Sequence, residues 1–314
     1  MSSENPHNDP AEQAALSPAA PSHASNLFCD ENGLRAGWRF FVYLLIVLGS
    51  GAITAIVVWS FLVPPRGMAT PFNRLLEEVV GFALVYGAAL IMSRLERRPV
   101  GEYGLPVQEA FGGKFWLGFL FGLLEVTLLV GLIAAFGGYS FGNLALHGSE
   151  IFRWGLFHLV LFVFVGLFEE FLFRGYTQYT LADGVGFWPA AIVLSLIFGR
   201  LHLQNSGENW VGVAGVVLVA LLFAFTLERT GNLWYAVGLH TSFDWGETYL
   251  YSVPNSGAIL PGHLSNAVWK GPGWLSGGSV GPEASVFCFL TMGLQFLVVM
   301  WLFPRRGVAA QPQN

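Results

Sequence analysis

Long apolar runs dominate the pattern of hydrophobic and polar positions along the chain. A helix needs about 20 apolar residues to cross the hydrocarbon core of a bilayer. Runs of this kind begin near eight residues: Phe40, Leu75, Phe115, Arg153, Phe187, Val211, Leu233 and Ala284. In lipid, backbone N–H and C=O groups must be paired within each segment, which favours helices. The pattern predicts an all-α fold, a polytopic membrane bundle of about eight transmembrane helices.

The ends of the chain lack this pattern. Residues 1–30 are rich in Ala, Ser and Pro and show no apolar periodicity, so they cannot bury enough surface to offset chain entropy. We expect a disordered tail at residues 1–30, a membrane domain at residues 31–306 and a short tail at residues 307–314. The first run is too long for a signal-peptide core and has no small-residue cleavage site, so we expect it to be retained.

Composition agrees with a membrane protein. Of 314 residues, 54% are hydrophobic and only 11% charged, and the mean hydropathy is +0.56. The net charge of -5 offers no basic surface, so nucleic acid is not an expected partner. Ten of the 15 Lys and Arg residues fall on the side that holds both termini, which predicts cytoplasmic termini. We expect an integral protein of the cell (plasma) membrane whose partner is the lipid bilayer.

Two features concern how the helices pack. The segment GFLFG, Gly118 to Gly122, has the small-xxx-small spacing that permits close helix approach. The fourth run is expected to continue as one long helix to about Ala182. That length would bring its glutamates level with the end of the fifth run.

The segment GLFEEFLFRG places three ionisable groups in an apolar run. Intramembrane charge is expensive and is therefore a functional hypothesis by default. Glu170 and Arg174 are at i and i+4, so the arginine can pair with that carboxylate, whereas Glu169 points about 100° around the helix and stays free. The alternative is a buried ion pair that only fixes packing.

Two other runs carry ionisable pairs at helical spacing. The fifth ends in FGRLH, with Phe198 and His202 at i and i+4, and the seventh carries HTSFD, with His240 and Asp244 at i and i+4. One buried histidine is usually a satisfied core residue. Two histidines, a carboxylate pair and an aspartate on three helices point to a site. The other intramembrane or interfacial ionisable groups are expected to be structural: Glu77, Glu78, Glu125, His158, Glu228 and Arg229.

The three motifs, in this order, resemble EExxxR, FxxxH and HxxxN/D of the CPBP intramembrane proteases, also called Abi. This family includes CaaX prenyl endopeptidases and bacteriocin-processing or immunity-associated proteins. The motifs cover Gly166 to Asp244, within an expected protease core at about residues 115–252. The resemblance implies an intramembrane endopeptidase that acts on a membrane-embedded or membrane-proximal peptide or protein.

By the same resemblance, Glu169 activates water together with His202, and Glu170 and Arg174 hold the site in shape. His240 and the residue at position 244 complete it. That residue is Asp244, where the CaaX branch usually has Asn, so the sequence leaves the prenylated substrate open.

Peptide hydrolysis needs a base for water, an acid for the leaving amine and donors for the oxyanion. The motif residues supply each of these groups. Four of them could also hold a divalent metal, most suitably zinc, with one position open for water: Glu169, His202, His240 and Asp244. The sequence leaves metal-bound and metal-free water as alternatives.

Other classes of membrane protein also place ionisable residues within their helices. The sequence contains neither H-E-x-x-H nor G-x-G-D, the motifs of two other membrane-protease classes. A proton-coupled transporter could use Glu169, His202 and His240 as a relay. A non-catalytic immunity or binding protein on the same scaffold is a further alternative.

Overall fold

The computed structural model describes residues 29–30, 33–61 and 70–305. The predicted tails at residues 1–30 and 307–314 lie almost wholly outside these ranges. Within them the chain is helical with only short paired strands, so the predicted all-α fold is confirmed. The antiparallel strand pairs are β1 (Cys29–Asp30) with β2 (Gly33–Leu34), and β3 (Tyr139–Ser140) with β4 (Val268–Trp269).

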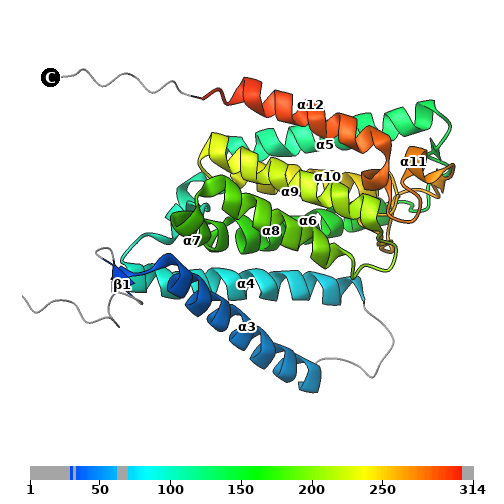
Figure 1. Ribbon diagram of the computed structural model, residues 1–314. Helices are drawn as coiled ribbons and strands as arrows, with labels where there is room; N and C mark the ends of the chain where they lie inside the picture. Colours follow the sequence, from blue (N-terminus) through cyan, green and yellow to red (C-terminus); the bar gives the residue numbers. More distant parts are fainter. Residues whose placement is uncertain (1–28, 31–32, 62–69, 306–314) are drawn as a thin grey trace, which may run out of the picture.

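The eight predicted runs correspond to helices that form one bundle (Figure 1). They are α3 (Ala36–Phe61), α4 (Pro71–Glu96), α5 (Gly113–Ala135), α6 (Ser149–Arg174), α8 (Phe187–His202), α9 (Trp210–Thr230), α10 (Trp234–Trp245) and α12 (Val286–Leu302). The chain also forms α7 (Tyr176–Val185), a π-helical turn at Gly246–Leu250 and the short α11 (Gly273–Ser276). In the described ranges, five helical segments are long and apolar enough to cross a membrane, and α8 and α12 are shorter apolar helices.

The predicted long fourth helix is interrupted at Gly175, where α6 ends and α7 begins. A Cβ atom at Gly175 would lie 2.4 Å from the carbonyl oxygen of Phe171. Glycine therefore permits the bend, because a larger residue would clash with the preceding turn. The chain continues through α7, and α8 then returns along the bundle to end at His202 (Figure 1).

Close approach between α5 and α10 follows from glycines on both helices. On α5, a Cβ atom added at Gly118 would lie 2.1 Å from the carbonyl oxygen of Tyr235. A Cβ atom added at Gly122 would lie 2.4 Å from the carbonyl oxygen of Leu239. On α10, a Cβ atom added at Gly238 would lie 2.0 Å from the carbonyl oxygen of Phe115. The GFLFG prediction of close packing is thus confirmed, and it fixes α10 against α5.

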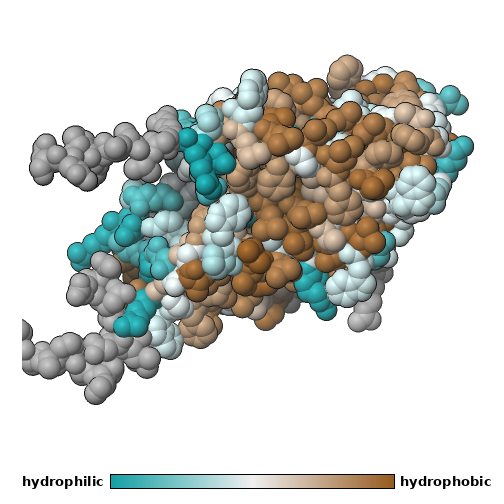
Figure 2. Space-filling model, turned by 45° about the horizontal axis from the view of Figure 1, so that its top comes forward, coloured by the Kyte–Doolittle hydropathy of each residue, from teal (hydrophilic) through white to brown (hydrophobic). Residues whose placement is uncertain are grey.

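The surface agrees with a membrane environment. Apolar side chains cover the middle of the face shown in Figure 2, and hydrophilic side chains gather toward its two ends. The start of α3 and the end of α12 lie at the same end of the bundle (Figure 1). The protein is therefore an integral membrane protein.

Candidate active site

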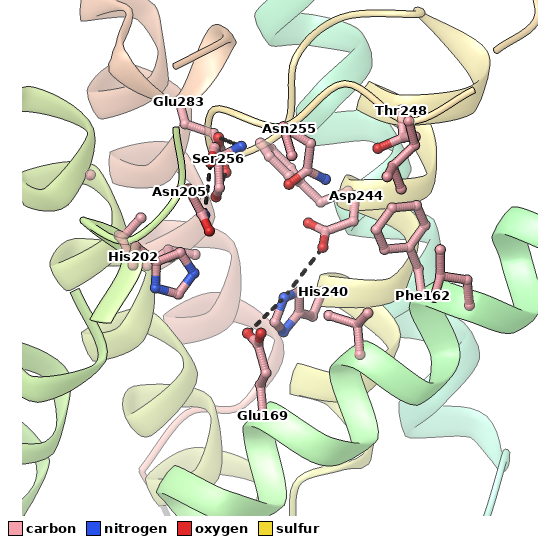
Figure 3. A pocket seen from close by; sticks show the side chains of 18 of the residues that line it. Phe162, Glu169, His202, Asn205, His240, Asp244, Thr248, Asn255, Ser256 and Glu283 are labelled. Atoms are coloured by element: carbon pink, nitrogen blue, oxygen red, sulfur yellow. Dashed lines mark hydrogen bonds and ion pairs between the residues drawn. The ribbon is translucent and has the colours of Figure 1, made fainter. Parts of the chain in front are cut away.

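A cavity of about 490 Å³ lies within the bundle and brings the three sequence motifs together (Figure 3). Its walls come from α4, α5, α6, α8, α9, α10, α12 and the loop around Asn255 to Pro261. Four of the predicted site residues line it: Glu169, His202, His240 and Asp244. The other two, Glu170 and Arg174, are buried behind it at 0% and 2% exposure.

His240 is the centre of the polar contacts. Its Nδ1 lies 3.0 Å from Oε1 of Glu170, and its Nε2 lies 3.5 Å from Oδ2 of Asp244 and 3.8 Å from Oε2 of Glu169. The ring stacks on Phe223, with centroids 5.1 Å apart. Since a carboxylate can only accept, Nδ1 donates to Glu170 and Nε2 is directed toward the cavity.

The pair predicted from the i,i+4 spacing is present. Arg174 Nη1 donates to Oε1 of Glu170 at 3.3 Å, so this oxygen accepts from both Arg174 and His240. The guanidinium also lies over the ring of Phe198, 4.5 Å from its centroid. The buried pair thereby holds the imidazole of His240 in one orientation, as outer partners of functional histidines commonly do.

Glu169 is left free by this arrangement. Its side chain is 20% exposed, and its closest ion-pair contact is the 3.8 Å approach to His240. Adjacent glutamates on one helix therefore have different environments, because they point to different sides of α6.

His202 ends α8 and faces the cavity from another wall (Figure 3). Its Nδ1 lies 2.9 Å from the carbonyl oxygen of Phe198. A carbonyl accepts, so Nδ1 carries the proton and the neutral ring keeps Nε2 as an acceptor. The i,i+4 spacing of Phe198 and His202 thus fixes the tautomer through the backbone.

The zinc predicted from the sequence stays a prediction. Within the described ranges, no group of three or more His, Cys, Asp or Glu side chains is placed to hold a metal ion. Zinc ligands converge at about 2.0–2.3 Å from the ion. The metal remains a prediction from the sequence, and the chemistry below uses the side chains alone.

The cavity contains polar residues that the motifs did not indicate. They come from connections between helices: Asn205, Thr248, Asn255, Ser256 and Glu283. No spacing rule links these positions to the motifs, because long-range folding of the loops brings them in. Glu283 accepts hydrogen bonds from the backbone N–H and the hydroxyl of Ser256.

Glu283 also has an unusual protonation equilibrium. Burial raises the pKa of its carboxyl to about 8, and the nearby Asp244 acts in the same direction, whereas the hydrogen bonds from Ser256 lower it. A carboxylic acid with this pKa changes charge near neutral pH.

Several groups predicted to be structural have ordinary partners. Glu78 is buried at 4% exposure, and its Oε1 lies 3.0 Å from Nε of Arg74. Glu228 pairs with Arg305 at 3.3 Å. His158 Nε2 lies 3.1 Å from the Pro261 carbonyl oxygen.

Ionisable groups enclosed among membrane helices define a membrane protein with a buried polar site. The family model described as type II CAAX prenyl endopeptidase Rce1-like matches residues 151–246. All six motif residues lie inside this segment. Comparisons with curated proteins and with solved structures found no match. This match over residues 151–246 supports the CPBP/CAAX protease family, and the resemblance read from the motifs is confirmed.

Proposed function

We propose that the protein is an intramembrane endopeptidase of the CPBP type, in which Glu169 and His202 activate the water that hydrolyses a peptide bond. One observation carries this proposal. Glu170 is held by Arg174 and His240, whereas the carboxylate of Glu169 faces the cavity that His202 also lines. A general base must be free to reach the proton it removes.

The proposed reaction begins with water in the cavity between Glu169 and His202. The carboxylate of Glu169 takes one proton as the water oxygen attacks the scissile carbonyl carbon. The tetrahedral intermediate then collapses as the C–N bond breaks, and Glu169 returns the proton to the leaving amine. The products are one new carboxyl group and one new amine, so atoms and charge balance. His202 Nε2 is an acceptor that can orient the attacking water.

His240 is the proposed donor toward the oxyanion. Its Nδ1 donates to Glu170, so Nε2 can donate into the cavity when the ring is protonated on both nitrogens. The nearby carboxylates of Glu170 and Asp244 favour this cationic form. Preorganised donors of this kind stabilise the charge that develops on the carbonyl oxygen. Asp244 lies 3.5 Å from Nε2, and we propose that it positions this ring.

The proposed substrate is a peptide or protein segment embedded in or next to the membrane. The matched family contains CAAX prenyl endopeptidases by its description, so a peptide with a prenylated cysteine is one candidate. Asp244 stands where Asn is usual in that branch, and an unmodified membrane peptide is the other candidate. Should zinc bind, Glu169, His202, His240 and Asp244 are the residues that would hold it, and it would supply an activated water.

The test uses purified full-length protein in liposomes and quenched fluorescent peptides, with and without a prenylated cysteine. Wild type should cleave members of at least one set. Glu169→Gln should abolish cleavage because the amide keeps the shape but cannot take the proton. Glu150→Gln is the matched control, an exposed glutamate at the start of the same helix, and it should retain full activity.

Unchanged cleavage in Glu169→Gln would overturn the assigned base. If wild type binds the peptides without cleaving any, the non-catalytic alternative is favoured. Proton flux across the liposome membrane that is lost in Glu169→Gln would favour the transporter instead.

A further inference from the structure

Glu125 on α5 is a buried acid that the proposed reaction does not use. It is 6% exposed and lines the same cavity as the motif residues. The sequence predicts only a structural role for this carboxyl. Among the described residues, however, no side chain or backbone group forms a hydrogen bond or ion pair with it. Its carboxyl is therefore available to whatever enters the cavity.

Three further carboxyls lie close enough to interact with one another. Glu247, in the π-helical turn after α10, is within electrostatic range of Glu125, Asp244 and Glu283. It is fully buried, and both of its carboxyl oxygens lack a hydrogen-bond partner. Next to it, Thr248 lines the cavity with a buried hydroxyl that also has no partner.

Among the described residues, the basic side chain that this acidic part of the cavity does contact is His240, 3.5 Å from Asp244. Of the residues that line the cavity, the only Lys or Arg is Arg74, at the start of α4, which pairs with Glu78. Ionising several buried carboxyls that lack a counter-charge is costly, because each charged form is desolvated and like charges repel. A positive group that enters the cavity would relieve both penalties.

The surrounding walls favour a long side chain over a free ion. Val219, Phe243 and Met292 line the cavity together with Glu125. A lysine or arginine can bury its methylene stem along such a surface while its charged end meets the carboxyls. A metal ion fits less well, because the described residues contain no group of three ligands placed to hold one.

We propose that Glu125, with Asp244 and Glu283, forms a specificity subsite that binds the basic side chain of a lysine or arginine in the peptide substrate. This inference rests on the proposed function and adds the substrate class. Glu125 is its specificity-determining residue, because Asp244 also contacts His240 and Glu283 also holds Ser256.

The experiment compares peptides that differ at one position. Lysine and its uncharged counterpart norleucine are placed in turn at each position flanking the scissile bond, and kcat/KM is measured for wild type, Glu125→Gln and Glu150→Gln. At one position, wild type and Glu150→Gln should prefer lysine by about tenfold or more, as expected for a desolvated charge pair. Glu125→Gln should lose most of this preference, measured as the ratio of kcat/KM for the lysine peptide to that for the norleucine peptide.

Equal rates for both peptides at every position in wild type would overturn the inference and leave the protease proposal intact. A lysine preference that survives in folded Glu125→Gln would also overturn it. If no peptide is cleaved, the proposed function fails, and binding decides the inference alone. The fluorescent lysine peptide should then bind wild type more tightly than the norleucine peptide, and an equal affinity would refute the subsite.

Discussion

Nδ1 of His240 on α10 lies 3.0 Å from Oε1 of Glu170 on α6, although the two residues are 70 positions apart in the chain. The same oxygen accepts from Arg174, one helical turn further along α6. The contact joins two of the three motifs into one unit. It also explains why the two neighbouring glutamates differ in their contacts. Glu170 is bound by Arg174 and His240, whereas Glu169 lines the cavity.

Replacing Arg174 by alanine should reduce both stability and activity. The substitution leaves Glu170 buried without its cation, a change that typically costs about 3–5 kcal/mol. Thermal unfolding of the purified protein in detergent measures the loss. Arg153→Ala is the control, because Arg153 is an exposed arginine on the same helix whose side chain is 71% accessible. Equal unfolding temperatures for Arg174→Ala and wild type would show that the pair does not support the fold.

Replacing Asp244 by asparagine should leave most of the activity, within about tenfold of wild type. The amide keeps the reach of the carboxyl toward His240 Nε2, now 3.5 Å from Oδ2, and can still position the ring. Peptide turnover and metal content should be measured on the same preparation. A parallel loss of bound metal and turnover would instead identify Asp244 as a metal ligand, since a neutral amide is a much weaker one.

Replacing Gly118 by alanine should destabilise the bundle by about 1–3 kcal/mol, the usual cost of overpacking a well-packed interface. The added methyl would lie 2.1 Å from the Tyr235 carbonyl oxygen, so α10 must move away from α5. Activity should fall as well, because α10 carries His240 and Asp244. Gly131→Ala on the same helix is the matched control, since nothing lies within 4 Å of its added methyl. Similar unfolding temperatures and rates for the two variants would contradict this account of the packing.

The stability of the protein should depend on the protonation of Glu283. Its pKa rises from an ordinary 4.5 to about 8 on folding, so the folded state holds a proton that the unfolded chain releases. The resulting stabilisation is full below pH 4.5 and is lost as the pH rises to 8, with a slope of up to about 1.4 kcal/mol per pH unit.

Glu283→Gln cannot titrate at this position, so the unfolding temperature of wild type relative to this variant should fall between pH 5 and pH 8. Ser256→Ala is a useful companion, because it removes the hydroxyl donor that lowers the pKa of Glu283. If the difference in unfolding temperature between wild type and Glu283→Gln stays constant with pH, Glu283 has the same protonation in the folded and unfolded states.

The sequence by itself determined the helical class, the starts of the main helices and the motif positions. Apolar runs of membrane length have few structural solutions, and i,i+4 spacing settles which residues share a helix face. The partner of Arg174 and the close approach at Gly118 could be predicted for the same reason, since both depend on local geometry.

Only the tertiary structure decided how the helices meet. The break at Gly175 was not predicted, and the motifs gave no indication that Glu125 and Glu283 line the cavity with Asp244. Residues on different helices and loops carry no mutual spacing along the chain, because their distances are set by the packing of the whole bundle. Local periodicity therefore specified the elements and the motif chemistry, while long-range packing specified which carboxyls are paired, which are free and which face the substrate cavity.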